Sequence, residues 1–385
     1  MTTPLLFTPL TLRGVTLRNR IAVAPMDMYC AENGYPTAFH RTHYGKFAMG
    51  GAGLVFVEAT GVTRTGRITN GCLGLWDDDQ IDAYRPITTQ LRDQGAASCL
   101  QLAHSGRKGS TQRAWEGNGP LTAENLANGD ETWTPLAPSD NAFAGGWLTP
   151  RPLDRAGMDD IRDAFVAAAL RALKAGFDMV ELHMAHGYLL QSFLSPIANK
   201  RTDDYGGSLE NRMRFPVEVA KAVRAALPND VPLLARISAT DWIDGGWEPE
   251  DSVVLARALK DTGVDLIDCS SGGNLVAGAT NSNLARGPAF QAPFAKRIRA
   301  ETGILTQAVG LIRTPALAED LLQQGAADII ALGRQMLFNP FWAHHAAETL
   351  GVTGHFDNWP EQYAWWLDKW AAGLRSMGET PLAKE

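Results

Sequence analysis

Short apolar runs alternate with amphipathic stretches along almost the whole chain, and this alternation constrains the fold more than any other feature. The apolar runs predict strands, because they are short, nearly continuous in hydrophobic residues and bounded by glycine, proline or polar residues. The eight candidates are Ile21–Met26, Gly53–Val62, Ala97–His104, Met179–His186, Pro232–Thr240, Leu266–Gly272, Ile304–Gly310 and Ile329–Leu337. Strands of this kind, separated by helices, indicate a parallel sheet covered by helices. Eight such units predict an α/β protein with a closed (β/α)8 TIM barrel.

The stretches between the runs have helical periodicity. In "DDIRDAFVAAALRALKAGF" one face carries Ile161, Phe165, Ala168, Ala169 and Ala172, and "PEDSVVLARALKDTG" ends in a glycine stop. A doubly wound sheet is the structural alternative, and it requires a GxGxxG-type turn after the first strand. The corresponding segment, "IAVAPMDMYCAENG", has no such turn, which favours the barrel.

Residues 105–155 interrupt the rhythm after the third strand. They are rich in Gly, Pro, Asn and Trp and show no apolar periodicity of their own. We therefore predict a long loop or cap excursion within a single domain spanning residues 1–385, because long ordered loops on barrels usually shape the active site.

Charge and composition exclude several classes of partner. The net charge of -7 gives no basic surface for nucleic acid, and no polybasic run suggests a membrane surface. The N-terminus lacks the pattern of a secretory signal and no long apolar segment occurs, so we expect a cytoplasmic protein with a small-molecule partner. The four cysteines lack metal-type spacing, and we expect them to be reduced and to bind no metal.

Barrel enzymes place their active sites at the carboxyl ends of the strands, and polar residues are numerous there. These ends carry Pro25, Met26, Asp27, Tyr29, Gln101, His104, His183, His186, Tyr188, Arg236, Gly310, Gly333 and Arg334. The glycine turns after strands seven and eight, with Arg334, predict a phosphate site. Arg236 lies within an apolar strand, so it requires either an anionic ligand or a salt bridge inside the barrel, for example with Glu181.

The pair His183 and His186 has three interpretations on local sequence alone. An HxxH pattern supplies ligands in metal-dependent hydrolases, although no carboxylate lies within this turn. The histidines are otherwise structural, or they donate hydrogen bonds to one carbonyl oxygen while the nearby Tyr188 gives up a proton.

The segment that follows, "HGYLLQSFLSPIANKRTDDYGGSLENRMRF", resembles the old yellow enzyme family of FMN-dependent ene-reductases. Similar segments are "LFTPLTLRGVTLRNRIAVAPM", "GGAGLVFVEATGV", "QLAHSGRK", "RGPAF" and "ALGRQMLFNP", so the resemblance covers nearly the whole chain. The C-terminal "QYAWWLDKW" is similar to the bacterial thermophilic-like and xenobiotic reductase subgroup.

The resemblance implies tightly bound, non-covalent FMN, with NADPH or NADH as reductant. The FMN contacts it implies are Ala24, Pro25, Met26, Asp27, Ala59, Gln101 and Arg236, with Gly310, Gly333 and Arg334 at the phosphate. His183 and His186 would hold the carbonyl oxygen of the substrate, Tyr188 would protonate Cα after hydride transfer from flavin N5 to Cβ, and Tyr29 would face the substrate. Activated alkenes next to carbonyl, imide or nitro groups are the implied substrates, and no metal site is assigned.

Two further features follow from the resemblance. Trp366, in a C-terminal extension of residues 355–385 placed near the active site, is similar to an aromatic residue that lines the pocket or reaches a neighbouring subunit, and we expect a homodimer or homotetramer. Asp27 stands where the subgroup usually has a cysteine beside the flavin. It either alters the flavin potential or turns away to cap backbone N–H groups. A metal-dependent hydrolase and a flavin-binding barrel without ene-reductase activity remain the alternative functions.

Overall fold

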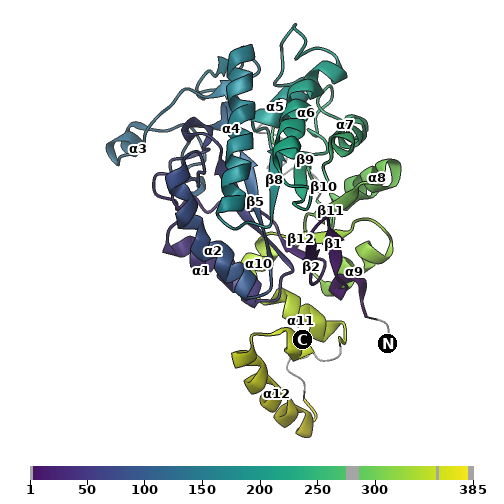
Figure 1. Cartoon of the computed structure of the whole chain (residues 1–385). Coiled ribbons are helices and arrows are strands. Elements are labelled where there is room, and N and C mark those ends of the chain that lie inside the picture. The colour runs from purple at the N-terminus through teal and green to yellow at the C-terminus, as the bar shows by residue number, and fades with distance from the viewer. Residues whose placement is uncertain (1–2, 275–285, 353–354, 380–385) are drawn as a thin grey trace.

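A computed structural model describes residues 3–274, 286–352 and 355–379, and its centre is a closed barrel of parallel strands (Figure 1). The barrel order is β10-β11-β12-β3-β4-β5-β8-β9, which is the chain order closed into a ring. The strands are β3 (Ile21–Val23), β4 (Leu54–Gly61), β5 (Ala97–Ala103), β8 (Met179–Met184), β9 (Leu233–Ser238), β10 (Leu266–Ser270), β11 (Leu305–Val309) and β12 (Ile329–Leu332). The predicted (β/α)8 barrel is confirmed.

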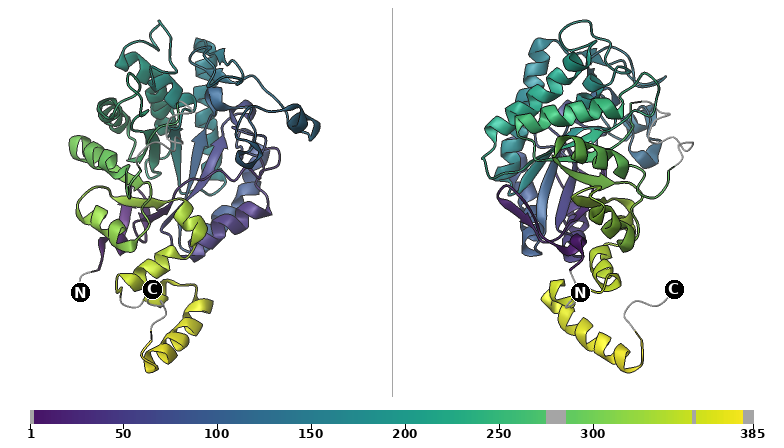
Figure 2. Two further views of the ribbon diagram at one scale, coloured as in Figure 1. Left: turned by 180° about the vertical axis from the view of Figure 1, so that it is seen from behind. Right: turned by 90° about the vertical axis from the view of Figure 1, so that its right-hand side faces the viewer.

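Helices form the outer layer and shield the outward faces of the strands (Figures 1 and 2). They are α1 (Ala38–Met49), α2 (Ile81–Asp93), α4 (Arg155–Lys174), α6 (Leu209–Ala226), α7 (Pro249–Thr262), α8 (Ala292–Thr302), α9 (Pro315–Gln323) and α11 (Trp342–Thr349). The predicted apolar face of α4 is buried. The predicted glycine stop of α7 is Gly263, whose φ of 96° is left-handed and free of strain for glycine.

All eight predicted strands end later than the observed ones, and the eighth extends furthest beyond its observed end. The eighth strand ends at Leu332, and the residues from Arg334 onward form the short helix α10 (Arg334–Phe338) where extended chain was predicted. The apolar residues of this helix continue the hydrophobic run, and an apolar run does not distinguish a strand from a buried helical turn. Gly333 turns the chain between the two elements.

A hairpin that the sequence reading missed closes the amino-terminal end of the barrel. Its strands are β1 (Leu10–Leu12) and β2 (Val15–Leu17), which pair antiparallel. Leu12 and Leu17 are buried in one cluster with inward-facing residues of the barrel strands, including Phe56. The barrel therefore has a packed floor at one end, and its carboxyl-terminal end carries the open site.

The excursion predicted for residues 105–155 contains little regular structure. It holds the short helix α3 (Ala123–Ala127) and the two-residue strands β6 (Leu136–Ala137) and β7 (Arg151–Pro152), which pair with each other. Figure 1 shows α3 at the tip of a loop that reaches away from the barrel.

Removing the side chain of Phe56, which packs against the hairpin at the amino-terminal end of the barrel, should strongly destabilise the protein. Phe56 is fully buried, so Phe56→Ala should lower the free energy of unfolding by about 3–5 kcal/mol in urea titrations. Leu148→Ala is the control, because Leu148 is 43% exposed and its truncation should change stability by less than about 0.5 kcal/mol. Equal losses in the two variants would contradict this account of the core.

Candidate active site

A cavity of about 360 Å³ opens at the carboxyl ends of the barrel strands. Eight predicted site residues line it: Ala24, Pro25, Met26, His186, Arg236, Gly310, Gly333 and Arg334. They come from β3, β8, β9, β11 and β12 or the turns directly after them, so the closed barrel brings together segments more than 300 residues apart in the chain. The space is large enough for a cofactor the size of a mononucleotide.

The end of the cavity predicted to bind phosphate combines glycine turns with cationic side chains. Gly310 has a φ of 118°, and a Cβ there would lie 2.8 Å from Nε2 of Gln291. A side chain at either Gly310 or Gly333 would also take up room at the cavity wall. Arg334 and Arg313 line the same cavity, so backbone N–H groups and positive charge are both available to a phosphate.

Arg236 is placed by the pairing of β9 with its neighbours. It lies opposite His183 on β8 and opposite Asp268 on β10, so all three side chains point to the barrel interior. Its Nε lies 3.2 Å from Oδ2 of Asp268, close enough for an ion pair but not aligned as a hydrogen bond. The salt bridge considered with Glu181 is wrong, because Glu181 instead accepts a hydrogen bond of 2.8 Å from Gln101.

The carboxyl groups inside the barrel have raised pKa values, so they neutralise the positive charge of Arg236 only in part. Burial raises the pKa values of both Glu181 and Asp268, and the Arg236 guanidinium opposes this rise. Arg236 is only 6% exposed and lines the cavity, so its positive charge can interact with a ligand bound there. A buried guanidinium of this kind favours an anionic or electron-rich ligand.

His183, His186 and Tyr188 form a cluster of rings at the end of β8. The ring centroids of His183 and His186 are 5.0 Å apart, and those of His183 and Tyr188 are 4.9 Å apart. Burial lowers the pKa values of both histidines well below the usual range, and the charges of Arg236 and Lys108 add to this effect. Burial raises the pKa of Tyr188. The cluster therefore consists of two neutral imidazoles and a protonated phenol.

The turn that carries His186 is held in an unusual backbone conformation. His186 has a φ of 61°, and its carbonyl accepts a 2.8 Å hydrogen bond from Nζ of Lys108. The same ammonium donates to the carbonyl of Gly273 at 3.2 Å. A Cβ on Gly187 would lie 2.2 Å from the oxygen of Gly273, so only glycine allows these two loops to cross so closely.

Asp27 lies beside a second buried carboxyl group. Burial raises the pKa of Asp27 to about 7, while Arg236 and a hydrogen bond from the Ala59 backbone oppose the rise. Burial, with a smaller contribution from Asp27, raises the pKa of Glu58 to about 8. Glu58 accepts 2.8 Å hydrogen bonds from the Met28 N–H and the Tyr44 hydroxyl, whereas Oδ1 of Asp27 is buried without a partner.

The remaining predicted site residues do not line the cavity themselves. Ala59 and Gln101 are buried in β4 and β5. Tyr29 packs against Tyr188 and Cys72 in a small cluster, and its ring centroid lies 6.1 Å from that of Trp115 in the excursion. Their predicted roles stay predictions.

Several cavity residues were missed by sequence reasoning. They are Ser270, Ser271, Arg286, Phe290, Gln291, Leu311, Ile312, Arg313 and Gln335. Ser270 and Ser271 end a predicted strand and were available by the same rule as the other strand ends. Gln291 had no such signal, because it reaches the cavity only through folding of the β10–α8 connection.

Trp366 lies away from this cavity. It is 66% exposed on α12 (Glu361–Ser376), which contacts the turn at His355–Asn358 and projects from the barrel near α11 (Figures 1 and 2). The C-terminal extension is therefore not near the active site of its own chain, which corrects that expectation. The idea that Trp366 reaches the site of a neighbouring subunit stays a prediction.

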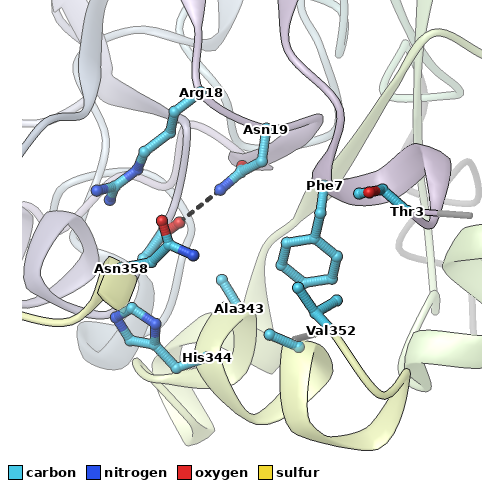
Figure 3. Close-up of a pocket in the computed structure, with 10 residues that line it drawn as sticks. Thr3, Phe7, Arg18, Asn19, Ala343, His344, Val352 and Asn358 are labelled. Carbon is cyan, nitrogen blue, oxygen red and sulfur yellow. Dashed lines mark hydrogen bonds between the residues drawn. The ribbon is translucent and has the colours of Figure 1, made fainter. Parts of the chain in front are cut away.

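A second, smaller hollow lies at the opposite end of the barrel. It is lined by residues such as Arg18, Asn19 and His344, and Nδ2 of Asn19 donates a 2.8 Å hydrogen bond to the Gly51 carbonyl (Figure 3). Asn19 and Gly51 precede β3 and β4, so this hollow faces the amino-terminal end. None of the predicted site residues lines it.

Within residues 3–274, 286–352 and 355–379, no group of three or more histidine, cysteine or acidic side chains could hold a metal ion. No helix in the same part of the chain is long and apolar enough to cross a membrane.

Comparison with known proteins identifies the family. The sequence pattern of the NADH:flavin oxidoreductase / NADH oxidase family matches residues 5–352. The chain belongs to this family. It is 42% identical over 351 residues to an NADPH dehydrogenase of Geobacillus sp. (strain WCH70), covering 91% of this chain and 95% of the relative. Membership of this family confirms the predicted resemblance to the old yellow enzymes.

Solved structures share the barrel. An old yellow enzyme homologue from Zymomonas mobilis is 28% identical with a TM-score of 0.73, covering 89% of this chain and 92% of that one. A 2-naphthoyl-CoA reductase has a TM-score of 0.79 at 25% identity over 90% of this chain, which spans about half (52%) of the length of that protein.

Family membership makes the chain an oxidoreductase with FMN as cofactor and NAD(P)H as reductant. The residues at the cavity fit this cofactor. Arg236 offers a positive charge inside the barrel. Arg334 and the turns at Gly310 and Gly333 line the same cavity, where the phosphate is predicted to bind. The cavity volume and the distribution of charge both suit a flat ring with a phosphate tail.

The shifted pKa of Asp27 predicts a pH dependence of stability. Its folded-state value of about 7 lies above the ordinary 3.8, so between these values the folded protein binds more protons than the unfolded chain. Stability therefore falls as pH rises through this window. Asp27→Asn cannot ionise and should lose less stability between about pH 4 and about pH 7 in urea titrations. Parallel pH profiles for the variant and the wild type would contradict the shift.

Proposed function

We propose that the protein reduces activated C=C bonds of α,β-unsaturated carbonyl, imide or nitro compounds. The observation that carries this proposal is the cluster of His183, His186 and Tyr188, in which His186 lines the cavity and the rings of His183 and Tyr188 pack behind it. The family supplies the redox half of the chemistry. The cluster adds hydrogen-bond donors and a proton source, which a carbonyl-conjugated alkene requires.

His183 and His186 would bind the substrate through its carbonyl or nitro oxygen. His183 is buried and His186 is partly exposed at the cavity, and the lowered pKa of each keeps its ring neutral, so each can offer one N–H to an oxygen on which negative charge develops during reduction. Donors of this kind stabilise the charge more strongly in a dry site than in water. The same polarisation draws electron density away from Cβ of the conjugated system.

Bound FMN would supply the hydride chemistry between NAD(P)H and Cβ, and Arg236, Gly310, Gly333 and Arg334 would hold it. The protein's own part is to place the alkene and to supply a proton. Tyr188 is suited to protonating Cα, because its hydroxyl stays protonated and its ring lies 4.9 Å from that of His183. Arg236 would stabilise the additional negative charge of the reduced cofactor.

The test compares wild-type protein with a His183→Ala/His186→Ala double variant. The wild type should be yellow, bleach with NADPH in the absence of oxygen, and regain its colour when cyclohexenone is added. The double variant should bind FMN and bleach in the same way, but reoxidation by the enone should fall by at least about 100-fold, the effect expected for lost oxyanion donors.

Three results would redirect the proposal. Unchanged reoxidation in the double variant would show that the two histidines do not bind the substrate. A yellow wild type that NADPH bleaches but no enone reoxidises would favour a flavin-binding barrel without ene-reductase activity. A colourless protein loaded with zinc would favour the metal-dependent hydrolase.

A separate prediction concerns the carboxyl group in place of the usual cysteine. Asp27 is close enough to Arg236 for their charges to interact, and any negative charge on Asp27 disfavours added electrons on the cofactor. Asp27→Cys should therefore raise the flavin midpoint potential, measured by anaerobic spectroelectrochemistry at pH 8. An unchanged or lower potential would show that Asp27 does not act on the cofactor.

A further inference from the structure

The two histidines of the cluster are held by different groups, although their ring centroids lie only 5.0 Å apart. Nδ1 of His183 accepts a 3.2 Å hydrogen bond from the backbone N–H of Ala185. A backbone N–H has a fixed proton, so Nδ1 must be bare, and the proton of the neutral ring is on Nε2. The backbone alone therefore decides the tautomer of His183.

No backbone N–H of the described residues donates to the ring of His186. Its Nε2 lies 2.7 Å from the hydroxyl of Ser270, at the end of β10. A hydroxyl can donate or accept, so the distance alone leaves two arrangements open. In one, Ser270 donates to a bare Nε2 and the ring proton is on Nδ1. In the other, Nε2–H donates to Ser270 and Nδ1 is bare.

The surroundings favour donation by Ser270. Ser270 is 5% exposed, and His186 is the hydrogen-bond partner that the described part of the chain gives to its hydroxyl. If Ser270 accepted, its own proton would face the cavity with no acceptor among the described residues, and the other ring nitrogen of His186 would be bare toward an electron-rich substrate oxygen. Both consequences cost free energy.

A different serine, Ser238, which pairs with Ser270 across the sheet, holds the backbone of His186. The His186 N–H donates to Oγ of Ser238 at 3.0 Å, and that hydroxyl donates its proton to the Gly272 carbonyl at 2.7 Å. Ser238 thus fixes where His186 sits, while Ser270 contacts only its ring. A serine on β9 therefore holds the backbone of His186, and a serine on β10 contacts the ring nitrogen whose protonation is in question.

We propose that Ser270 is a positioning residue that holds His186 as the Nδ1–H tautomer, opposite to the Nε2–H tautomer of His183. Each imidazole then keeps one N–H free of the protein for the same substrate oxygen. The inference rests on the proposed function for its catalytic meaning. The tautomers themselves are properties of the folded protein and are measurable without turnover.

The direct test is nitrogen-15 NMR of the FMN-loaded protein with labelled histidines. Protonated and bare ring nitrogens have well separated shifts, and the coupling of Nε2 to both carbon-bound ring protons identifies it. His183→Gln and His186→Gln variants assign the two rings. We expect a protonated Nε2 in His183 and a bare Nε2 in His186. A protonated Nε2 in His186 would overturn the proposal.

Ser270→Ala tests the cause. It should shift the His186 tautomer away from pure Nδ1–H and lower kcat for cyclohexenone by about tenfold, the effect of losing one hydrogen bond of about 1.4 kcal/mol. Ser270→Thr keeps the hydroxyl and should restore the tautomer. Ser271→Ala is the matched control, because its hydroxyl donates to Gln291 at 2.6 Å and should leave the His186 tautomer unchanged.

The outcomes separate this inference from the proposed function. If Ser270→Ala leaves the tautomer unchanged while the wild type reduces enones, only the role of Ser270 fails. If the tautomers are as expected but the FMN-loaded wild type reduces no enone, the proposed reaction fails and the positioning of His186 stands.

Discussion

The charge of Arg236 inside the barrel is the constraint on which the rest of the site depends. Parallel pairing sets this guanidinium beside His183 on one strand and Asp268 on the other. It lowers the pKa values of both histidines and opposes the rise in the pKa values of Asp27, Glu181 and Asp268. One buried cation therefore influences the protonation of these five groups at the mouth of the barrel, because electrostatic interactions are strong where water is excluded.

The second constraint is the close crossing of two loops above the barrel. The turn at His186 and the loop at Gly273 approach so closely that a side chain at Gly187 would collide with backbone. Lys108 joins the two carbonyls from the first residues of the excursion. Strain at a non-glycine residue with positive φ persists only where surrounding contacts hold it, and here these contacts fix the ring cluster next to the cofactor cavity.

Much of the site was predictable from the sequence because barrel topology is regular. Once eight alternating units are accepted, residues at the ends of strands must meet at one rim, and Pro25, His186, Arg236, Gly310 and Gly333 follow directly. The eighth strand was predicted too long because apolar residues stand on both sides of the change from strand to helix, at Ala331–Leu332 and at Met336–Leu337. Gln291, Lys108 and the salt-bridge partner of Arg236 were not predictable, since they depend on loop paths and strand register.

The sequence by itself determined the closed barrel, the rim where chemistry occurs and the identity of the groups that meet there. These follow from local hydrophobic periodicity and from the chemical demands of polar residues at strand ends, both of which are written in neighbouring residues. Only the tertiary structure decided which groups touch: Asp268 and not Glu181 beside Arg236, Ser270 at the ring of His186, and α12 away from the cavity of its own chain. Such contacts join residues far apart in the chain, and their distances are set by register and packing, which periodicity does not encode.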